Sequence, residues 1–149
     1  MTWANQRVFA ACATLPDDAL DAYIINPEWK AGRILQHIVG GATWYVYCLG
    51  IADWEDIPAL SSTADLRDLA AMLERFDILI ASAAHLPDEL LEFQDENGAK
   101  RVLRSTILAQ AIHHATEHRA QLMDALESRG HNAINLDDID FWAFEATEG

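Results

Sequence analysis

Residues 111–122, AIHHATEHRAQL, place three histidines and one glutamate within six positions of a single segment. The whole chain contains six histidines, so this segment is a local concentration of titratable side chains. Imidazole nitrogens bind divalent metals and transfer protons near neutral pH. His114 and His118 are spaced i and i+4, so both rings lie on one face of a helix, about one turn apart. Two imidazoles in that arrangement can reach one cation.

A third candidate ligand lies in residues 33–45, RILQHIVGGATWY. His37 sits at the edge of an apolar stripe there, with Gly40 and Gly41 one turn further on. Glycine in a helix interior costs about 1 kcal/mol relative to alanine, so the pair indicates open volume beside the imidazole or close approach of another helix. Three neutral histidines from two helices would leave coordination positions free for water or substrate, which is typical of a catalytic metal site.

Inward-facing histidines also have an ordinary interpretation. A lone buried histidine usually hydrogen-bonds a backbone carbonyl, and an HxxxH spacing arises often by chance. Three buried imidazoles without partners would be costly, so we favour the metal site over this alternative. Glu117 is expected to be solvated or to hold an imidazole proton, with a catalytic base as the sharper alternative. His113 is expected beside the site, and His85 and His131 receive no role.

Four helices are predicted to position these side chains. The spacing of apolar residues gives helices over roughly residues 2–13, 29–49, 62–83 and 105–129. The third opens at a capping pair and carries the strictest pattern, with apolar residues at alternating steps of three and four. Such a pattern is typical of a bundle seam; its members are Leu66, Leu69, Leu73, Phe76, Ile80 and Ala83.

A short β-hairpin is predicted over residues 91–103, between the third and fourth helices. Asn97-Gly98 is the favoured dipeptide for a tight two-residue turn, and Leu91 and Phe93 alternate with polar neighbours. The chain is therefore expected to be an all-α protein, a four-helix bundle with one hairpin, forming a single domain over residues 1–149.

The C-terminal segment INLDDIDFWAF is too apolar for a free tail. Its aromatic residues Phe141, Trp142 and Phe144 are expected to pack back on the bundle.

The charge balance excludes several kinds of partner. A net charge of −14 argues against nucleic acid and against anionic membrane surfaces. The chain shows no signal segment and no apolar run long enough to span a bilayer. Cys12 and Cys48 lie in predicted helices without a CxxC pattern, so we expect reduced core thiols in a cytoplasmic protein, with a disulfide as the alternative.

Four phrases of the sequence resemble those of the DinB/YfiT-like superfamily. TWANQRVFAACATLPDDAL is similar to the family's opening helix, and ILQHIVGGATWYVYCLG resembles its second-helix phrase. AIHHATEHRAQLMDALESRG is similar to the signature in which a histidine precedes a His-Arg pair, and LDDIDFWAF resembles the closing phrase. The phrases occur in the family's order along nearly the whole chain.

This resemblance implies a four-helix bundle of the DinB/YfiT type that holds a divalent metal. The matching ligands are His37, His114 and His118, and Arg119 matches the arginine that follows the last ligand. Glu117 departs from the pattern, because many members carry histidine there. The resemblance also implies a homodimer. Characterised relatives include S-transferases and isomerases that use low-molecular-weight thiols, and metal-dependent hydrolases are assigned to the family as well.

Two classes of function remain open at this point. In the first, the protein is a metalloenzyme of the thiol S-transferase or hydrolase type, in which Glu117 or Arg119 orients the substrate or a ligand. In the second, it is a non-catalytic metal-binding or scaffold bundle. Imidazole suits Zn, Ni and Fe alike, so all three ions are candidates. For the homodimer, the apolar surplus points to Trp44, Tyr47 and Trp54 as interface residues.

Overall fold

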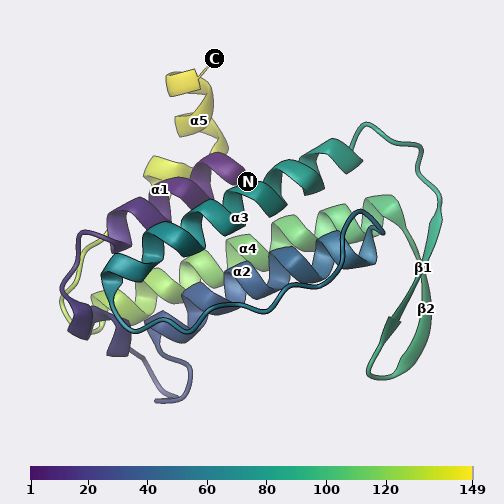
Figure 1. The fold of residues 1–149 in the computed structure, drawn as a ribbon. Helices are drawn as coiled ribbons and strands as arrows, with labels where there is room; N and C mark the ends of the chain where they lie inside the picture. Colours follow the sequence, from purple (N-terminus) through teal and green to yellow (C-terminus); the bar gives the residue numbers. More distant parts are fainter. Residues whose placement is uncertain (149) are drawn as a thin grey trace.

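The long helices of the protein run roughly side by side, with a hairpin at one end and a short C-terminal helix projecting from the side of the bundle near the N-terminus (Figure 1). The structure, a computed structural model, describes residues 1–148. In chain order its elements are α1 (Thr2–Cys12), η1 (Asp17–Asp21), α2 (Ala31–Cys48), η2 (Thr63–Asp65), α3 (Leu66–Ala83), β1 (Leu90–Asp95), β2 (Gly98–Leu103), α4 (Arg104–Glu127), η3 (Leu136–Ile139) and α5 (Phe141–Glu148), where η denotes a 3₁₀ helix. The predicted helical bundle with a hairpin between α3 and α4 is confirmed.

The bundle core forms where the sequence pattern predicted it. All six seam positions of α3 are buried, because steps of three and four residues keep them on one face of the helix. The Asp65 carboxylate accepts hydrogen bonds from the backbone N–H groups of Ser61 and Ser62, at 2.8 and 2.9 Å, which caps this end of α3 as predicted. Helix α2 lies between α3 and α4, so its residues face both neighbours.

Helix α2 begins two residues later than the sequence predicted, at Ala31 rather than about Trp29. The preceding residues form a turn instead, because the Asn26 side-chain oxygen accepts from the backbone N–H of Glu28 and the Asn26 carbonyl accepts from Trp29. Pro27 lies inside this turn, and a proline disfavours the helical conformation of the residue before it. The Trp29 indole is therefore free to reach across to α4. The first and fourth helices end one and two residues earlier than predicted, and the fourth begins one residue earlier.

The hairpin is present, but its turn lies one residue earlier than predicted. Strand pairing closes at Asp95 opposite Gly98, so the turn residues are Glu96 and Asn97. Gly98 has a φ of +107°, and no non-glycine residue among residues 1–148 has a positive φ. A two-residue turn centred on Asn97-Gly98 would demand positive φ at asparagine as well. In the observed hairpin Gly98 has a positive φ and Asn97 does not, so the steric cost of a positive φ at a residue with a Cβ atom is avoided.

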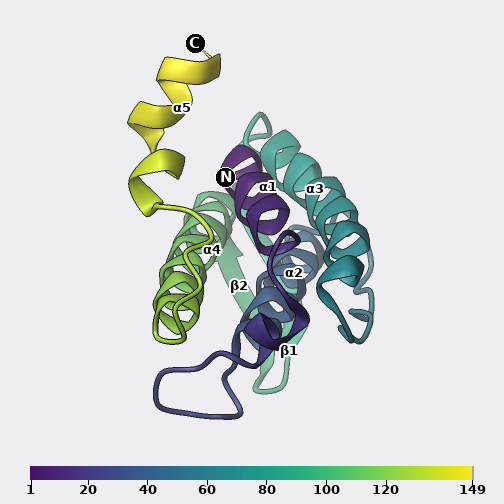
Figure 2. The ribbon, with the colours of Figure 1, turned by 90° about the vertical axis from the view of Figure 1, so that its left-hand side faces the viewer.

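The prediction for the C-terminal aromatic residues is wrong for two of the three. Phe141 and Trp142 are 76% and 83% exposed, and α5 stands away from the other helices (Figure 2). Only Phe144 makes an aromatic contact with the bundle, edge-on to Trp3 with ring centroids 5.5 Å apart. The buried Ile139 of η3 anchors the segment instead. The apolar composition of this segment did not reveal that α5 would stand out from the side of the bundle.

Both cysteines are free and buried, as expected for reduced core thiols. Burial raises the pKa of Cys12 and of Cys48 to about 12, which leaves neither thiol reactive near neutral pH. Within residues 1–148, no helix combines the length and the apolar character that a membrane span requires.

Candidate metal centre

Three histidines from two helices meet at one point of the bundle. The Nε2 atoms of His37 on α2 and His114 on α4 are 3.0 Å apart. One ring nitrogen from each of His37, His114 and His118 lies within 4.8 Å of the other two. His118 is 8% exposed, whereas the other two rings are half-buried. The three residues predicted from their spacing are therefore brought together by the structure.

Gly41 on α2 makes room for one of these rings. A Cβ atom at this position would lie 2.2 Å from Cε1 and 2.6 Å from Nδ1 of His114, closer than any real contact. The glycine pair was expected either to leave open volume beside His37 or to let another helix approach closely, and Gly41 does the second, since its space is filled by the ring from α4. Gly40 has no such neighbour, since its added Cβ would meet only Ile57 at 3.8 Å.

Gln121 and Trp29 fix the orientation of His118. The Gln121 Oε1 atom accepts a hydrogen bond from the Trp29 indole N–H at 3.0 Å and lies 2.9 Å from His118 Nδ1. An indole nitrogen only donates, so the atom facing it is the amide oxygen, which only accepts. His118 must then carry its proton on Nδ1, which leaves the lone pair of Nε2 free to bind a metal.

The surroundings of the cluster favour neutral imidazoles. Burial, and after it the neighbouring His118 and His37, lower the pKa of His114 to about 4. The pKa of His37 is also lowered, by burial first and then by His118 and Arg33. Only a neutral imidazole offers a lone pair to a metal. Both groups are therefore in the ligand form at neutral pH.

The donor set fits a divalent transition metal. Imidazole nitrogens suit Zn, Ni and Fe, and a tetrahedral site with bonds of about 2.0–2.1 Å holds its nitrogens about 3.3–3.4 Å apart. The separations within this cluster, from 3.0 Å up to 4.8 Å, bracket that value. Two Nε2 atoms facing each other also leave at least one lone pair directed at the shared space. These residues could hold a metal ion with three protein ligands.

Metal binding is expected to weaken only in acid. Protons compete with the metal for the imidazoles, and the pKa values of His37 and His114 lie below the ordinary value of 6.5. Affinity should therefore persist as the pH falls to about 6.5 and be lost as it falls further, towards about 4, where His114 takes up its proton. Metal content after dialysis at a series of pH values, measured by mass spectrometry, checks this. Half-release above pH 6.5 would contradict it.

A cleft of about 470 Å³ opens beside the cluster, and His37 and His114 form part of its wall. Other parts of the wall come from α2, including Arg33 and Trp44, and from the segment that follows α2, including Trp54 and Ile57. A small molecule in this cleft would lie against the face that carries the imidazoles. The cluster is therefore accessible from outside the protein.

Glu117 and His113 lie outside the histidine cluster. Both side chains are exposed on α4. Glu117 accepts a hydrogen bond from the Gln121 side-chain nitrogen at 3.3 Å, so it reaches His118 only through Gln121. Of the two roles expected for Glu117, its side chain is solvated, and Gln121 rather than Glu117 holds the imidazole proton.

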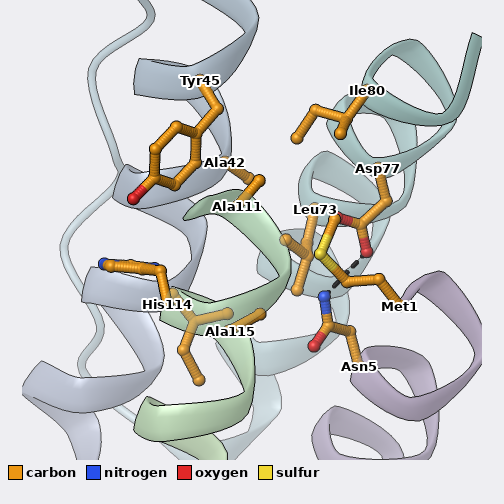
Figure 3. A pocket seen from close by; sticks show the side chains of 11 residues that line it. Met1, Asn5, Ala42, Tyr45, Leu73, Asp77, Ile80, Ala111, His114 and Ala115 are labelled. Carbon is orange, nitrogen blue, oxygen red and sulfur yellow. Dashed lines mark hydrogen bonds between the residues drawn. The ribbon is translucent and has the colours of Figure 1, made fainter. Parts of the chain in front are cut away.

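Arg119 is buried among α1, α3 and α4, away from the cleft. It donates hydrogen bonds to Asn5 at 2.6 Å and to Thr116 at 3.0 Å, and Asn5 in turn donates to Asp77 at 2.8 Å. Figure 3 shows Asn5 and Asp77 on one side of a small interior cavity of about 10 Å³, with His114 on the other side. Burial raises the pKa of Asp77 to about 6, although Asn5 and Arg119 lower it. These contacts give Arg119 a role in holding three helices together.

Gln121, Trp29 and Arg33 lie at the site but were not predicted as site residues. A signal existed for Gln121, because it lies three residues after His118 on the same helix face. Arg33 likewise precedes His37 by one turn. No local pattern marks Trp29, which reaches the site from a turn 92 residues away from Gln121.

Comparison with known proteins gives one match. The model of the DinB family matches residues 1–148, nearly the whole chain. No curated protein and no solved structure matches the chain.

Proposed function

Because the chain belongs to the DinB family and brings three histidines together beside a cleft, we propose that it is a metal-dependent enzyme. His37, His114 and His118 would hold one divalent ion, with Zn, Ni and Fe as candidates. The reaction would be thiol S-transfer, with a low-molecular-weight thiol as one substrate, or hydrolysis. The single observation that carries this proposal is the convergence of three ring nitrogens within 4.8 Å of one another.

The protein's own groups would prepare this site in two ways. Gln121 and Trp29 hold His118 with its Nε2 lone pair free, and Gly41 lets His114 lie close against α2. The cleft would hold a substrate against the imidazoles. Holding the reactants in the right geometry lowers the entropic part of the activation barrier. A bound divalent ion would supply Lewis-acid chemistry, stabilising an anionic nucleophile such as hydroxide or thiolate.

The alternative is a metal-binding or scaffold bundle without catalysis. A structural metal site is normally closed by four protein ligands. Within residues 1–148, the cluster that could hold an ion consists of three histidines, and no cysteine, aspartate or glutamate supplies a fourth ligand. The cleft beside the rings also favours a site that exchanges ligands with solvent. Both observations support the enzyme over the scaffold.

Activity is expected to depend on the metal. Protein purified without a His-tag should contain close to one divalent ion per chain and turn over at least one member of a panel of thiol-transfer and ester substrates. Chelation should abolish turnover, and adding back a divalent ion should restore it. His37→Ala should lower turnover by at least about a hundredfold, as expected for loss of a charge-stabilising element, without loss of helical circular dichroism.

Glu117→Gln serves as the comparison within the same helix. Glu117 is exposed, and within residues 1–148 its carboxylate accepts a hydrogen bond from Gln121 and from no other side chain, so this variant should keep its metal and most of its turnover. A large loss of turnover with metal retained would instead make Glu117 a catalytic base. If the metal-loaded protein shows no turnover above the chelated control, the scaffold alternative replaces the enzyme.

We further propose a homodimer, and a single domain over residues 1–149. Of the three interface candidates, Trp54 is 48% exposed, while Trp44 and Tyr47 are half-buried against each other with ring centroids 5.4 Å apart. Trp44 and Trp54 also line the cleft, so a partner that covered them would cover the cleft as well.

A further inference from the structure

The cleft beside the histidines differs in charge from the rest of the protein. The chain carries 24 acidic and 10 basic residues, yet the described residues that line the cleft include no aspartate or glutamate. Arg33 is the single lysine or arginine among them. A positive side chain in an acid-free cleft is suited to a negatively charged ligand.

Arg33 has no acidic partner within residues 1–148. Half of the lysines and arginines form ion pairs, namely Lys30, Arg75, Lys100, Arg101 and Arg104. Arg33 forms none, although a guanidinium presents several donors that match a carboxylate in two parallel hydrogen bonds. It lies four residues before His37 on α2, so both side chains project from one face of that helix.

Two acidic residues of the segment after α2 are engaged with other side chains. Glu55, in the segment after α2, binds Arg75 through two hydrogen bonds of 2.7 Å. Asp56 accepts a hydrogen bond from the Trp54 indole at 3.4 Å. Neither carboxylate lines the cleft, so neither competes with a ligand for Arg33.

The remaining wall of the cleft is largely apolar. Trp44 and Trp54 form a corner, with ring centroids 6.3 Å apart and planes at 66°, and Ile57 lies beside them. The Gln36 side chain donates to the Pro58 carbonyl at 2.8 Å, which ties the segment after α2 to the helix. Apolar walls with a few placed polar groups are typical of sites for small organic ligands.

We propose that the cleft binds a small organic carboxylate with an aromatic or apolar body. Its carboxylate would pair with Arg33, and its body would pack against Trp44 and Trp54. The part of the molecule that reacts would face His37 and His114; this last statement rests on the proposed function. Arg33 would then select anionic substrates, and the two tryptophans would select apolar ones.

Calorimetric titration with a matched ligand pair tests this proposal. The probes are 3-(indol-3-yl)propionate and its neutral primary amide, which differ in charge but hardly in size. Wild-type protein should bind the acid about tenfold more tightly than the amide, as one charged hydrogen-bonded pair predicts. Arg33→Gln should bind both with the same Kd. Trp54→Ala should weaken both by about threefold to tenfold, because the aromatic contact serves each probe equally.

Arg67→Gln is the matched control, because Arg67 is also exposed, forms no ion pair within the described chain and lies outside the cleft. It should keep the wild-type preference for the acid; loss of the preference there would mean that overall charge, not the cleft, sets it. Each titration is run on metal-loaded and on chelated protein. A preference for the acid that survives in Arg33→Gln, or equal binding of both probes by the wild type, overturns the proposal. The chelated series separates this outcome from failure of the proposed function, because Arg33 acts without metal.

Discussion

Replacing His118 with alanine is expected to abolish stoichiometric metal binding while leaving the helical circular dichroism largely intact. His118 is the most buried of the three histidines, and Gln121 holds its ring with Nε2 available. Loss of a residue that only orients a ligand typically costs about tenfold to a hundredfold in metal affinity, so loss of the ligand itself should cost more. Metal content by mass spectrometry and affinity by competition with a chromophoric chelator measure the effect.

His113→Ala is the matched control for this experiment. His113 is one residue from His114 on α4, but its side chain is exposed and stands outside the cluster. This variant should bind metal as the wild type does. Full metal occupancy in a variant with alanine at all three cluster positions would show that the ion binds elsewhere, and the assignment would fail.

Gly41→Ala is expected to destabilise the protein and to release the metal. An added Cβ would stand 2.2 Å from Cε1 of His114, so the ring would have to leave its place. The ring has little freedom to do so, since it packs between His37, Tyr45 and His118. Movement of this ring would separate its Nε2 from that of His37. Thermal unfolding and metal content of the purified variant test both effects.

Gly40→Ala, one residue before Gly41, is expected to leave both the stability and the metal content of the protein intact. Its Cβ would make only an ordinary contact with Ile57 at 3.8 Å. Alanine is the better helix former by about 1 kcal/mol, so this variant should be slightly more stable than the wild type and keep its metal. If Gly41→Ala keeps its metal and its thermal stability as Gly40→Ala does, the close packing of His114 against Gly41 is not required for metal binding.

Helical periodicity by itself determined the seam of α3 and the placement of two candidate ligands on one face of α4. The six seam residues are buried as predicted, because a pattern in steps of three and four residues leaves only one face for the core. The spacing of His114 and His118 fixes their separation in the same way, since both lie on one rigid helix. The position of His37 on the stripe of α2 and the glycine beside it also followed from local pattern.

Local pattern failed where two nearby conformations compete. At the hairpin the dipeptide Asn97-Gly98 indicated the turn, but the strands pair so that Gly98 alone takes the positive φ. Phe141 and Trp142 have large apolar side chains of the kind that is usually buried, yet they lie on a helix that stands away from the bundle. The hydrophobicity of a side chain indicates that its burial would be favourable. It does not indicate whether another part of the protein lies close enough to cover it.

Only the tertiary structure decided which distant side chains meet. His37 faces His114 across 77 residues of sequence, Trp29 meets Gln121 across 92, and Arg119 binds Asn5 across 114. The last contact places Arg119 in the interior of the bundle, although its position beside His118 had suggested a role in the site. The cleft likewise depends on how the segment after α2 folds back over that helix. Periodicity fixes the direction of a side chain relative to its own helix, whereas its partner depends on how helices pack against one another.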